Sequence, residues 1–346
     1  MPNLFNPDYL HHLANKHHLR PSKKYGQNYL IDPAVIDIIL EAAELTKDDT
    51  VIEVGPGFGT LTFALAERTQ KVFAFEIEKK LEPYWGEIQE NKKSRNQENN
   101  IEIVWGNVLR VIARSEERTT SPFDVAQGDP ELGSNGSQSL RFQEKSVSKG
   151  IPTASSVGLG MTQKYKVVSN LPYQITSPVI RLFLEAEKQP TFMVLMVQKE
   201  VAERICAKPG DMSLLSVAVQ YYADPEIITV VPRTSFWPVP GVDSAVVKIT
   251  IHDLPTGQAG TRTIAAAAGS RLTAVTIQNE KEFFHLVKAG FANRRKFLSK
   301  NLEPIVGKKN KHLLTEAFAQ IGLSPQVRAQ ELFIEQWEKL VRLLPA

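Results

Sequence analysis

Residues 53–61 read Glu53-Val54-Gly55-Pro56-Gly57-Phe58-Gly59-Thr60-Leu61. The run follows an apolar segment at 50–54 and leads into helical spacing at 60–68. Glycines at alternate positions let a backbone turn tightly from strand to helix and approach a ligand closely. The Gly-x-Gly-x-x-Gly pattern of a dinucleotide site is not met. The run therefore predicts a ligand-binding turn of another kind.

The next apolar segment, at 72–75, ends at Glu76, 17 residues beyond Gly59. A carboxylate in that position can accept hydrogen bonds from both hydroxyls of a ribose. A glycine turn without a pyrophosphate requirement suits a nucleoside that carries an amino-acid tail. We therefore interpret Gly55, Gly57, Gly59 and Glu76 as a site for S-adenosylmethionine. The alternative is a purely structural turn.

Strand-like apolar segments alternate with helical ones over the first 200 residues, which predicts a parallel, doubly wound α/β sheet of Rossmann-like type. From about residue 280 the spacing is helical to the end, which predicts a small α-helical C-terminal domain. The expected strands are 50–54, 72–75, 101–105, 165–169, 191–197, 227–231 and 244–251. The expected helices are 33–45, 60–68, 78–90, 176–187, 281–290, 294–302, 312–321 and 329–344.

The domain organisation follows from length and from two breaks in composition. The chain has 346 residues, and a usual size of about 150 residues per domain predicts about two domains. Residues 112–163 and 254–279 are rich in Gly, Ser, Thr and Pro and show little periodicity, so we interpret them as low-complexity insertions or linkers. We expect an N-terminal arm or helix at 1–22, a catalytic domain at 23–253, a linker at 254–279 and a helical domain at 280–346.

Composition excludes several classes of protein. Hydrophobic residues make up 42% and charged residues 23% of the chain, which excludes a wholly disordered or fibrous protein. No apolar window approaches the roughly 18 residues of a membrane span, and no secretory leader is evident. The single cysteine, Cys206, excludes an internal disulfide and a multi-cysteine zinc site. We expect a cytoplasmic protein without a metal site, and we interpret the histidines at 11, 12, 17 and 18 as part of a solvated arm or helix.

The net charge of +3 hides an uneven distribution. Residues 288–311 hold eight basic residues and one acid, and Arg20, Lys23 and Lys24 form a second basic group. Two basic patches on a nearly neutral chain suggest that the protein binds a polyanion. Solvated helix faces are the alternative interpretation.

A second motif, Asn170-Leu171-Pro172-Tyr173, follows the expected strand at 165–169, where α/β folds bind ligands. The Asn170 side-chain oxygen and the Pro172 carbonyl can accept the two N–H bonds of an exocyclic adenine amine, and Tyr173 offers a face for stacking or for a cationic methyl group. No strong general base is required, because the amine becomes acidic as it attacks, so orientation and electrostatics dominate. The motif indicates adenine N-methylation, with a plain turn as the alternative.

These motifs together resemble the ribosomal RNA adenine N6-dimethyltransferases, and the small-subunit (16S) enzymes more than the large-subunit resistance methylases. The resemblance runs from about residue 20 to the C-terminus, apart from the two insertions. The matching pieces are 24–30 (KYGQNYL), 53–62, Glu76, 170–173, 236–244 (FWPVPGVDS) and 291–296 (FANRRK).

The resemblance implies roles for individual residues. Gln27, Asn28 and Leu30 would line the cofactor site, beside Tyr29, which replaces the family's phenylalanine. Gly55 would contact the methionine moiety, Glu76 the ribose, and Asn170 both cofactor and target. Phe236 would stack on the flipped adenine opposite Tyr173. Arg294, Arg295 and Lys296 would contact RNA phosphates, and the helical C-terminal domain would recognise RNA largely by shape.

One position departs from the family. After the expected strand at 101–105 the family usually has Gly-Asp-Ala/Val-Leu, whose aspartate accepts a hydrogen bond from the cofactor adenine, whereas this chain has Gly106-Asn107-Val108-Leu109. The Asn107 oxygen can still accept that bond, but a neutral amide lacks the charge-assisted part, a difference of about 1 kcal/mol. We expect weaker cofactor binding and retained activity.

The resemblance implies a monomeric enzyme that transfers two methyl groups to each of two adjacent adenosines in a 16S rRNA hairpin, within a small subunit or its precursor, with a role in small-subunit biogenesis. One alternative is a ribosome-assembly factor that mainly binds RNA, with methylation secondary. Another is a large-subunit (23S) methylase. DNA adenine methylation is disfavoured, because that class usually carries an acid where Asn170 stands.

Overall fold

A computed structural model of the chain describes residues 3–19, 28–94, 100–109, 164–186, 188–252, 280–307 and 310–344. The expected insertions at 112–163 and 254–279 lie outside the described residues. The described chain forms two compact units, which we call the α/β unit and the helical unit. The α/β unit holds the described residues up to 109, then 164–202 and 226–251; the helical unit holds 203–225, 252 and the described residues from 280.

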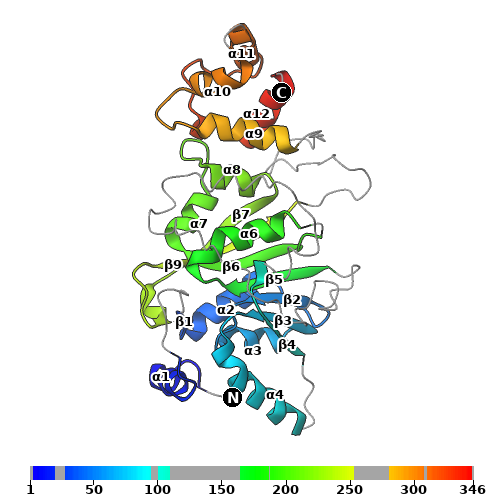
Figure 1. Cartoon of the computed structure of the whole chain (residues 1–346), viewed down its shortest axis with the longest axis vertical. Helices are drawn as coiled ribbons and strands as arrows, with labels where there is room; N and C mark the ends of the chain where they lie inside the picture. Colours follow the sequence, from blue (N-terminus) through cyan, green and yellow to red (C-terminus); the bar gives the residue numbers. More distant parts are fainter. Residues whose placement is uncertain are drawn as a thin grey trace, which may run out of the picture. The chain divides into compact units, whose positions relative to one another are not determined.

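A seven-stranded sheet forms the centre of the α/β unit, in the order β4-β3-β2-β5-β6-β9-β7 (Figure 1). The five strands from β4 to β6 are parallel to their neighbours, as the strand–helix alternation predicts, whereas β9 is antiparallel to β6. A parallel strand needs a crossover connection, and β9 follows β7 without an intervening α-helix. The strands are β2 (Thr50–Val54), β3 (Lys71–Glu76), β4 (Ile101–Trp105), β5 (Tyr165–Asn170), β6 (Phe192–Gln198), β7 (Ala223–Val231) and β9 (Ser244–Ile251).

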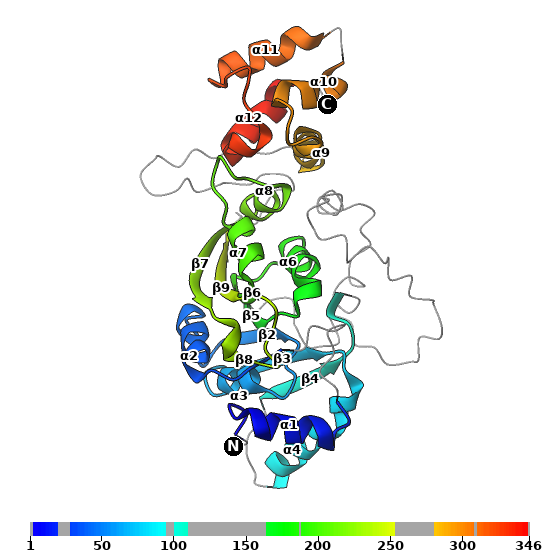
Figure 2. The same ribbon diagram turned by 90° about the vertical axis from the view of Figure 1, so that its left-hand side faces the viewer.

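Helices cover both faces of this sheet (Figure 2). On one face, α2 (Pro33–Ala42) and α3 (Thr60–Ala66) pack into a core with side chains of β2, β3, β5 and β6. On the other face lies α6 (Thr176–Leu184), which buries four apolar side chains. Because both faces are covered, β2 is buried along its whole length and β6 along all but its last residue.

The N-terminal residues form a helix, α1 (Pro7–Lys16), whose first turn is capped by the side chain of Asn6. It packs its apolar face with aromatic side chains of α4 (Glu82–Ser94), and the Lys16 ammonium lies 2.8 Å from the Glu87 carboxylate. Beside it, a two-stranded antiparallel sheet pairs β1 (Tyr29–Leu30) with β8 (Phe236–Trp237). The strand–helix alternation does not indicate this small sheet.

Distant residues anchor that small sheet. The Ser235 hydroxyl donates to the Asp32 carboxylate at 2.9 Å, between residues 203 positions apart in the chain. The backbone N–H of Ile31 donates to the carbonyl of Ser235, also at 2.9 Å. The same Asp32 caps the first turn of α2, so one side chain joins the helix to the end of the small sheet.

The helical unit is built on aromatic packing between α8 and α9. Tyr221 follows α8, and its ring centroid lies 4.5 Å from that of Phe283 and 4.9 Å from that of Phe284, both on α9. Two helices begin later than the spacing predicts, α10 at Leu298 and α12 at Ile334. The helices of this unit are α8 (Leu214–Gln220), α9 (Glu280–Phe291), α10 (Leu298–Val306), α11 (Lys311–Gln320) and α12 (Ile334–Leu343).

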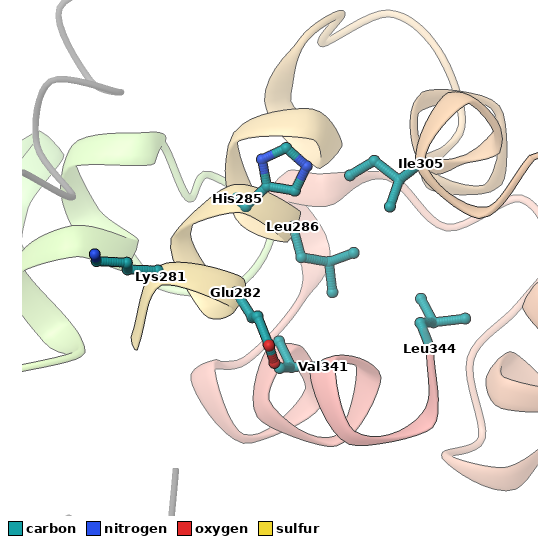
Figure 3. A pocket seen from close by; sticks show the side chains of 7 residues that line it. All are labelled: Lys281, Glu282, His285, Leu286, Ile305, Val341 and Leu344. Atoms are coloured by element: carbon teal, nitrogen blue, oxygen red, sulfur yellow. The ribbon is translucent and has the colours of Figure 1, made fainter. Parts of the chain in front are cut away.

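An apolar cavity of about 310 Å³ lies within the helical unit, among α9, α10 and α12 (Figure 3). Leu286, Ile305, Val341 and Leu344 form its apolar wall, and His285 stands at its edge. The cavity holds none of the expected site residues. Among the helices that the structure describes, none has the length and apolar character that a membrane span needs.

The glycine turn generates a prediction about stability. Gly59 has φ +91°, and a Cβ there would lie 2.8 Å from Phe63 Cε2 and 2.8 Å from Trp85 Cη2. Gly59→Ala combines a strained backbone with overpacking, so it should lower the free energy of unfolding by about 2 kcal/mol. Gly86 in α4 has no atom within 4 Å of an added Cβ. Gly86→Ala should therefore raise the free energy of unfolding by about 0.5–1 kcal/mol. Urea titration of both variants is the measurement, and equal stabilities would contradict the argument.

Candidate active site

The candidate site lies at the carboxyl ends of β2 and β5, where the strand order reverses and α/β sheets form a crevice. The two strands pair only from Thr50 to Ile52, opposite 165–167. Beyond that point the Ser169 hydroxyl donates to the Val54 carbonyl at 2.7 Å and accepts the Val54 N–H at 3.3 Å. This buried side chain replaces the missing backbone ladder while the strands separate.

The structure brings the glycine turn and the Asn-Leu-Pro-Tyr motif together. Gly55 has φ +78°, and its N–H donates to the Phe75 carbonyl at 2.9 Å. A Cβ built on Gly55 would lie 3.5 Å from the ring of Pro172. The two motifs, which the sequence separates by more than one hundred residues, therefore form one site.

Glu76 supports the turn through both of its carboxylate oxygens. Its Oε2 accepts the N–H of Gly57 at 3.1 Å, and its Oε1 accepts the N–H of Glu78 at 2.7 Å. Burial raises the pKa of Glu76, and these two N–H donors oppose the rise. An ionised carboxylate offers about four lone-pair positions, so both oxygens can accept a further bond from a ribose hydroxyl.

Two aromatic side chains hold the carbonyls of the same turn. The indole N–H of Trp85 donates to the Gly57 carbonyl at 3.0 Å, and the Tyr84 hydroxyl donates to the Phe58 carbonyl at 2.6 Å. Neither residue belongs to one of the motifs that the sequence displays. Their only sequence signal is an aromatic pair on the helical segment that follows Glu76.

Three buried polar atoms beside the turn have no hydrogen-bond partner among the described residues: the Tyr29 hydroxyl, Glu53 Oε2 and the Thr62 hydroxyl. Tyr29 is 8% exposed, and its Cε1 would lie 2.8 Å from a Cβ on Gly57. Burial raises the pKa of Glu53 to about 8, while the neighbouring Thr62 hydroxyl lowers it. Because buried polar atoms are normally paired, this environment fits a bound polar nucleoside with a charged tail.

The target motif is held in a defined orientation. The Asn170 side-chain N–H₂ donates to the Asn28 carbonyl at 3.2 Å, which leaves the Asn170 Oδ1 as an acceptor. The Pro172 carbonyl accepts the N–H of Ile175 at 3.0 Å and keeps its second lone pair. The Tyr173 hydroxyl lies 2.8 Å from the buried Ser244 hydroxyl, which fixes the ring, and burial raises the pKa of Tyr173.

Other predicted site residues lie in different surroundings. Phe236 is only 1% exposed and packs in the core cluster with Leu30, its cross-strand partner. An adenine could stack on Phe236 only after that side chain is uncovered, so this role stays a prediction. Leu30 belongs to β1 of the small sheet and Asn28 directly precedes that strand, whereas Gln27 lies outside the described residues. The expected RNA contacts, Arg294, Arg295 and Lys296, are exposed and belong to the helical unit.

Asn107 has a structural partner that the sequence analysis did not anticipate. Its Oδ1 accepts the backbone N–H of Leu109 at 3.0 Å. An aspartate could accept this N–H with one oxygen and bind an adenine amine with the other. The asparagine has a single acceptor atom for both tasks.

The site combines a glycine turn at a switch point, an acid that ends the next strand and an adjoining Asn-Leu-Pro-Tyr motif. These features define the class of S-adenosylmethionine-dependent methyltransferases. A family model described as ribosomal RNA adenine dimethylase matches residues 18–261. The chain belongs to this family, whose members are S-adenosylmethionine-dependent.

Curated relatives agree with this assignment, and solved structures agree with the fold. The chain is 34% identical to ribosomal RNA small subunit methyltransferase A of Pelotomaculum thermopropionicum, over 97% of this chain and 95% of the relative. It is also 34% identical to the protein of that name in Enterococcus faecalis, over 96% and 93%. A dimethyladenosine transferase from Plasmodium falciparum has a similar fold, with TM-score 0.60 and 21% identity over 90% and 95% of the two chains. The 23S rRNA methyltransferase ErmE also has a similar fold, with TM-score 0.56 and 22% identity over 91% of this chain and 98% of that chain.

The buried Glu53 generates a prediction about pH. The folded chain keeps this carboxyl protonated up to about pH 8, whereas the unfolded chain releases the proton near 4.5. Its contribution to stability is therefore complete below the unfolded pKa and is lost as pH rises through the folded pKa. Glu53→Gln has no carboxyl to ionise, so it does not lose stability in this way. The free energy of unfolding of Glu53→Gln minus that of wild type should therefore rise between pH 5 and pH 8 by on the order of a few kcal/mol.

Urea unfolding of the cofactor-free protein at several pH values measures this difference. Glu87→Gln is the control, because hydrogen bonding to Lys16 lowers the pKa of the exposed Glu87, so its difference from wild type should not grow across that range. A pH-independent difference for Glu53→Gln would contradict an elevated pKa.

Asn107 generates a prediction about cofactor affinity. Asn107→Asp should bind S-adenosylmethionine more tightly by about 1 kcal/mol, or roughly fivefold, because the second carboxylate oxygen accepts a charge-assisted bond. Isothermal titration of the cofactor into both proteins is the measurement. Equal affinities would show that the Asn107 oxygen serves both partners without loss.

Proposed function

We propose that the chain transfers methyl groups from S-adenosylmethionine to the N6 atoms of two adjacent adenosines in a hairpin of small-subunit (16S) rRNA. The substrate would be a small subunit or its precursor, the enzyme would act as a cytoplasmic monomer, and the reaction would serve small-subunit biogenesis. The names of the relatives support the small-subunit target. The observation that carries the chemistry is the Asn170 amide, anchored by Asn28 with its oxygen free to accept.

The chain's own groups orient the amine. The Asn170 oxygen and the Pro172 carbonyl accept the two N–H bonds of adenine N6, which favours a pyramidal nitrogen with its lone pair available for attack. The bound cofactor supplies an electrophilic methyl group on a sulfonium. Nitrogen–carbon bond formation accompanies sulfur–carbon cleavage, and the acidified amine then loses a proton to solvent. Because no strong base is needed, catalysis depends on orientation and electrostatics.

Cofactor contacts follow from the turn. We assign Glu76 to the ribose hydroxyls and Gly55 to the methionine moiety. At Gly57 and Gly59 the backbone would approach the cofactor closely. Tyr173, fixed by Ser244, offers its face to the base or to the methyl group. A base within a helix must be extruded to reach this crevice, and a base in an unpaired loop costs less free energy to present.

We assign RNA recognition to the helical unit. Arg294, Arg295 and Lys296 would bind phosphates, which supply affinity and register but no base identity. Because α8 packs with α9, we include α8 with residues 280–346 in the RNA-binding domain. A ribosome-assembly factor with secondary methylation remains the second candidate, favoured by the Asn107 departure.

Substitution of the target motif tests the proposal. Asn170→Ala removes the acceptor that orients the amine, so both methyl transfers should fall at least about a hundredfold, with RNA affinity largely unchanged. The measurement is tritiated methyl transfer to 30S particles that lack the modification, with mass spectrometry of the product. Asn15→Ala, an exposed asparagine of α1, is the control and should retain activity.

Unchanged dimethyladenosine in Asn170→Ala would reject the role of Asn170. Wild-type binding to 30S particles without methyl transfer would instead support the assembly-factor candidate. Methylation of naked 23S RNA in preference to 30S particles would indicate the large-subunit class.

A further inference from the structure

The turn between α9 and α10 carries an exposed surface of mixed chemistry. Arg294, Arg295 and Lys296 are exposed, and Phe297, which follows them directly, is 40% exposed. We call these four residues the basic turn. A single exposed apolar residue is ordinary on a protein surface, so the exposed ring alone carries no conclusion. Its position after three consecutive cations is what requires an explanation.

Hydrogen bonds from the Asn301 and Asn293 side chains hold the backbone of the basic turn in place. Asn301, which is 8% exposed, donates through its side-chain N–H₂ to the Gly290 carbonyl at 2.6 Å and to the Asn293 carbonyl at 2.9 Å. The Asn293 side chain accepts the N–H of Arg295 at 3.2 Å, and its carbonyl accepts that of Lys296 at 3.0 Å. This bonding ends the helical spacing at Phe291 and delays α10. The turn is therefore ordered before any partner binds.

A second exposed ring of the helical unit provides a comparison. Phe333 is 56% exposed and stands directly before α12, as Phe297 stands directly before α10. Its neighbours in sequence include the acids Glu331 and Glu335 in place of cations. The two positions share a local backbone setting and differ in the sign of the surrounding charge. Of these two rings, Phe297 is the one that stands beside consecutive cations.

Cations next to an exposed ring match the chemistry of an unpaired nucleotide. Arginine and lysine bind phosphates, and an aromatic face stacks on a base that is not already stacked within a helix. Bases inside a double helix have no free face, so a paired RNA could use the cations but not the ring. We propose that Phe297 stacks on an unpaired base whose neighbouring phosphates bind Arg294, Arg295 and Lys296. The inference rests on the proposed function in that the partner is RNA.

Fluorescence anisotropy with the full-length protein separates the two kinds of contact. The probes are a labelled RNA hairpin with an unpaired loop and a fully paired RNA of equal length, each titrated over a series of salt concentrations. The slope of log K against log salt reports phosphate contacts, and stacking changes affinity without changing that slope. Phe297→Ala should weaken hairpin binding by about 5- to 100-fold with an unchanged slope, and should leave duplex binding unaltered.

Matched variants complete the design. Phe297→Tyr keeps a flat ring and should bind like wild type, whereas Phe297→Leu keeps apolar volume and should bind like Phe297→Ala. Phe333→Ala should have no effect. Arg295→Ala should weaken binding of both probes and reduce the magnitude of the slope of log K against log salt by about 1. Thermal unfolding of each variant checks that the helical unit is intact.

The outcomes are distinguishable. Wild-type affinity in Phe297→Ala or in Phe297→Leu would overturn the stacking contact, as would equal losses in Phe333→Ala. In those cases a reduced slope in Arg295→Ala would still uphold RNA binding by the basic turn. Failure of the wild-type protein to bind either RNA would overturn RNA binding by the basic turn, whereas the methyl-transfer assay on 30S particles tests the proposed function separately.

Discussion

The Ser169 hydroxyl bonds to both backbone polar groups of Val54 at the point where β2 and β5 stop pairing. A crevice at the end of a parallel sheet requires neighbouring strands to separate, and separation leaves buried backbone groups without partners, which costs free energy. One short side chain removes that cost. The strands can then diverge while Pro172 stays close to Gly55, where an added Cβ would lie 3.5 Å from its ring. The site and the central sheet therefore depend on the same small interaction.

Two buried carboxyls next to the glycine turn differ in their hydrogen bonding. Glu76 accepts two backbone N–H bonds, whereas Glu53 Oε2 has no hydrogen-bond partner in the described part of the chain. Burial raises the pKa of both groups; two backbone N–H donors oppose the rise for Glu76, and the Thr62 hydroxyl opposes it for Glu53. Two carboxyls of the same residue type thus differ through their environments: one is bonded by two backbone N–H donors, and the other has a pKa raised to about 8.

Sequence periodicity located most of the sheet because its strands are short apolar runs bounded by turns; β2 and β4 occupy the expected residues, and Glu76 ends β3 as expected. The helix α8 was missed because it is buried on nearly all sides and shows no amphipathic period. The late start of α10 depends on side-chain bonds of Asn293, and the burial of Phe236 depends on a strand pairing with β1. Long-range partners of this kind leave no local pattern. The approach of Pro172 to Gly55 and the roles of Trp85, Ser169 and Ser244 likewise depend on the folded structure.

The pairing of β1 with β8, and the bond between Ser235 and Asp32, join segments 203 positions apart in the chain. Contacts between such distant segments form late, because the chain must first lose the entropy of closing a long loop. During synthesis from the N-terminus, Tyr29 and Leu30 emerge early but gain their strand partners, Trp237 and Phe236, only after residue 237 has been made. A nascent chain therefore carries the glycine turn and even Asn170 before one wall of its crevice exists. Maturation of the binding site is consequently a late event in the life of the polypeptide, timed by the completion of its α/β unit.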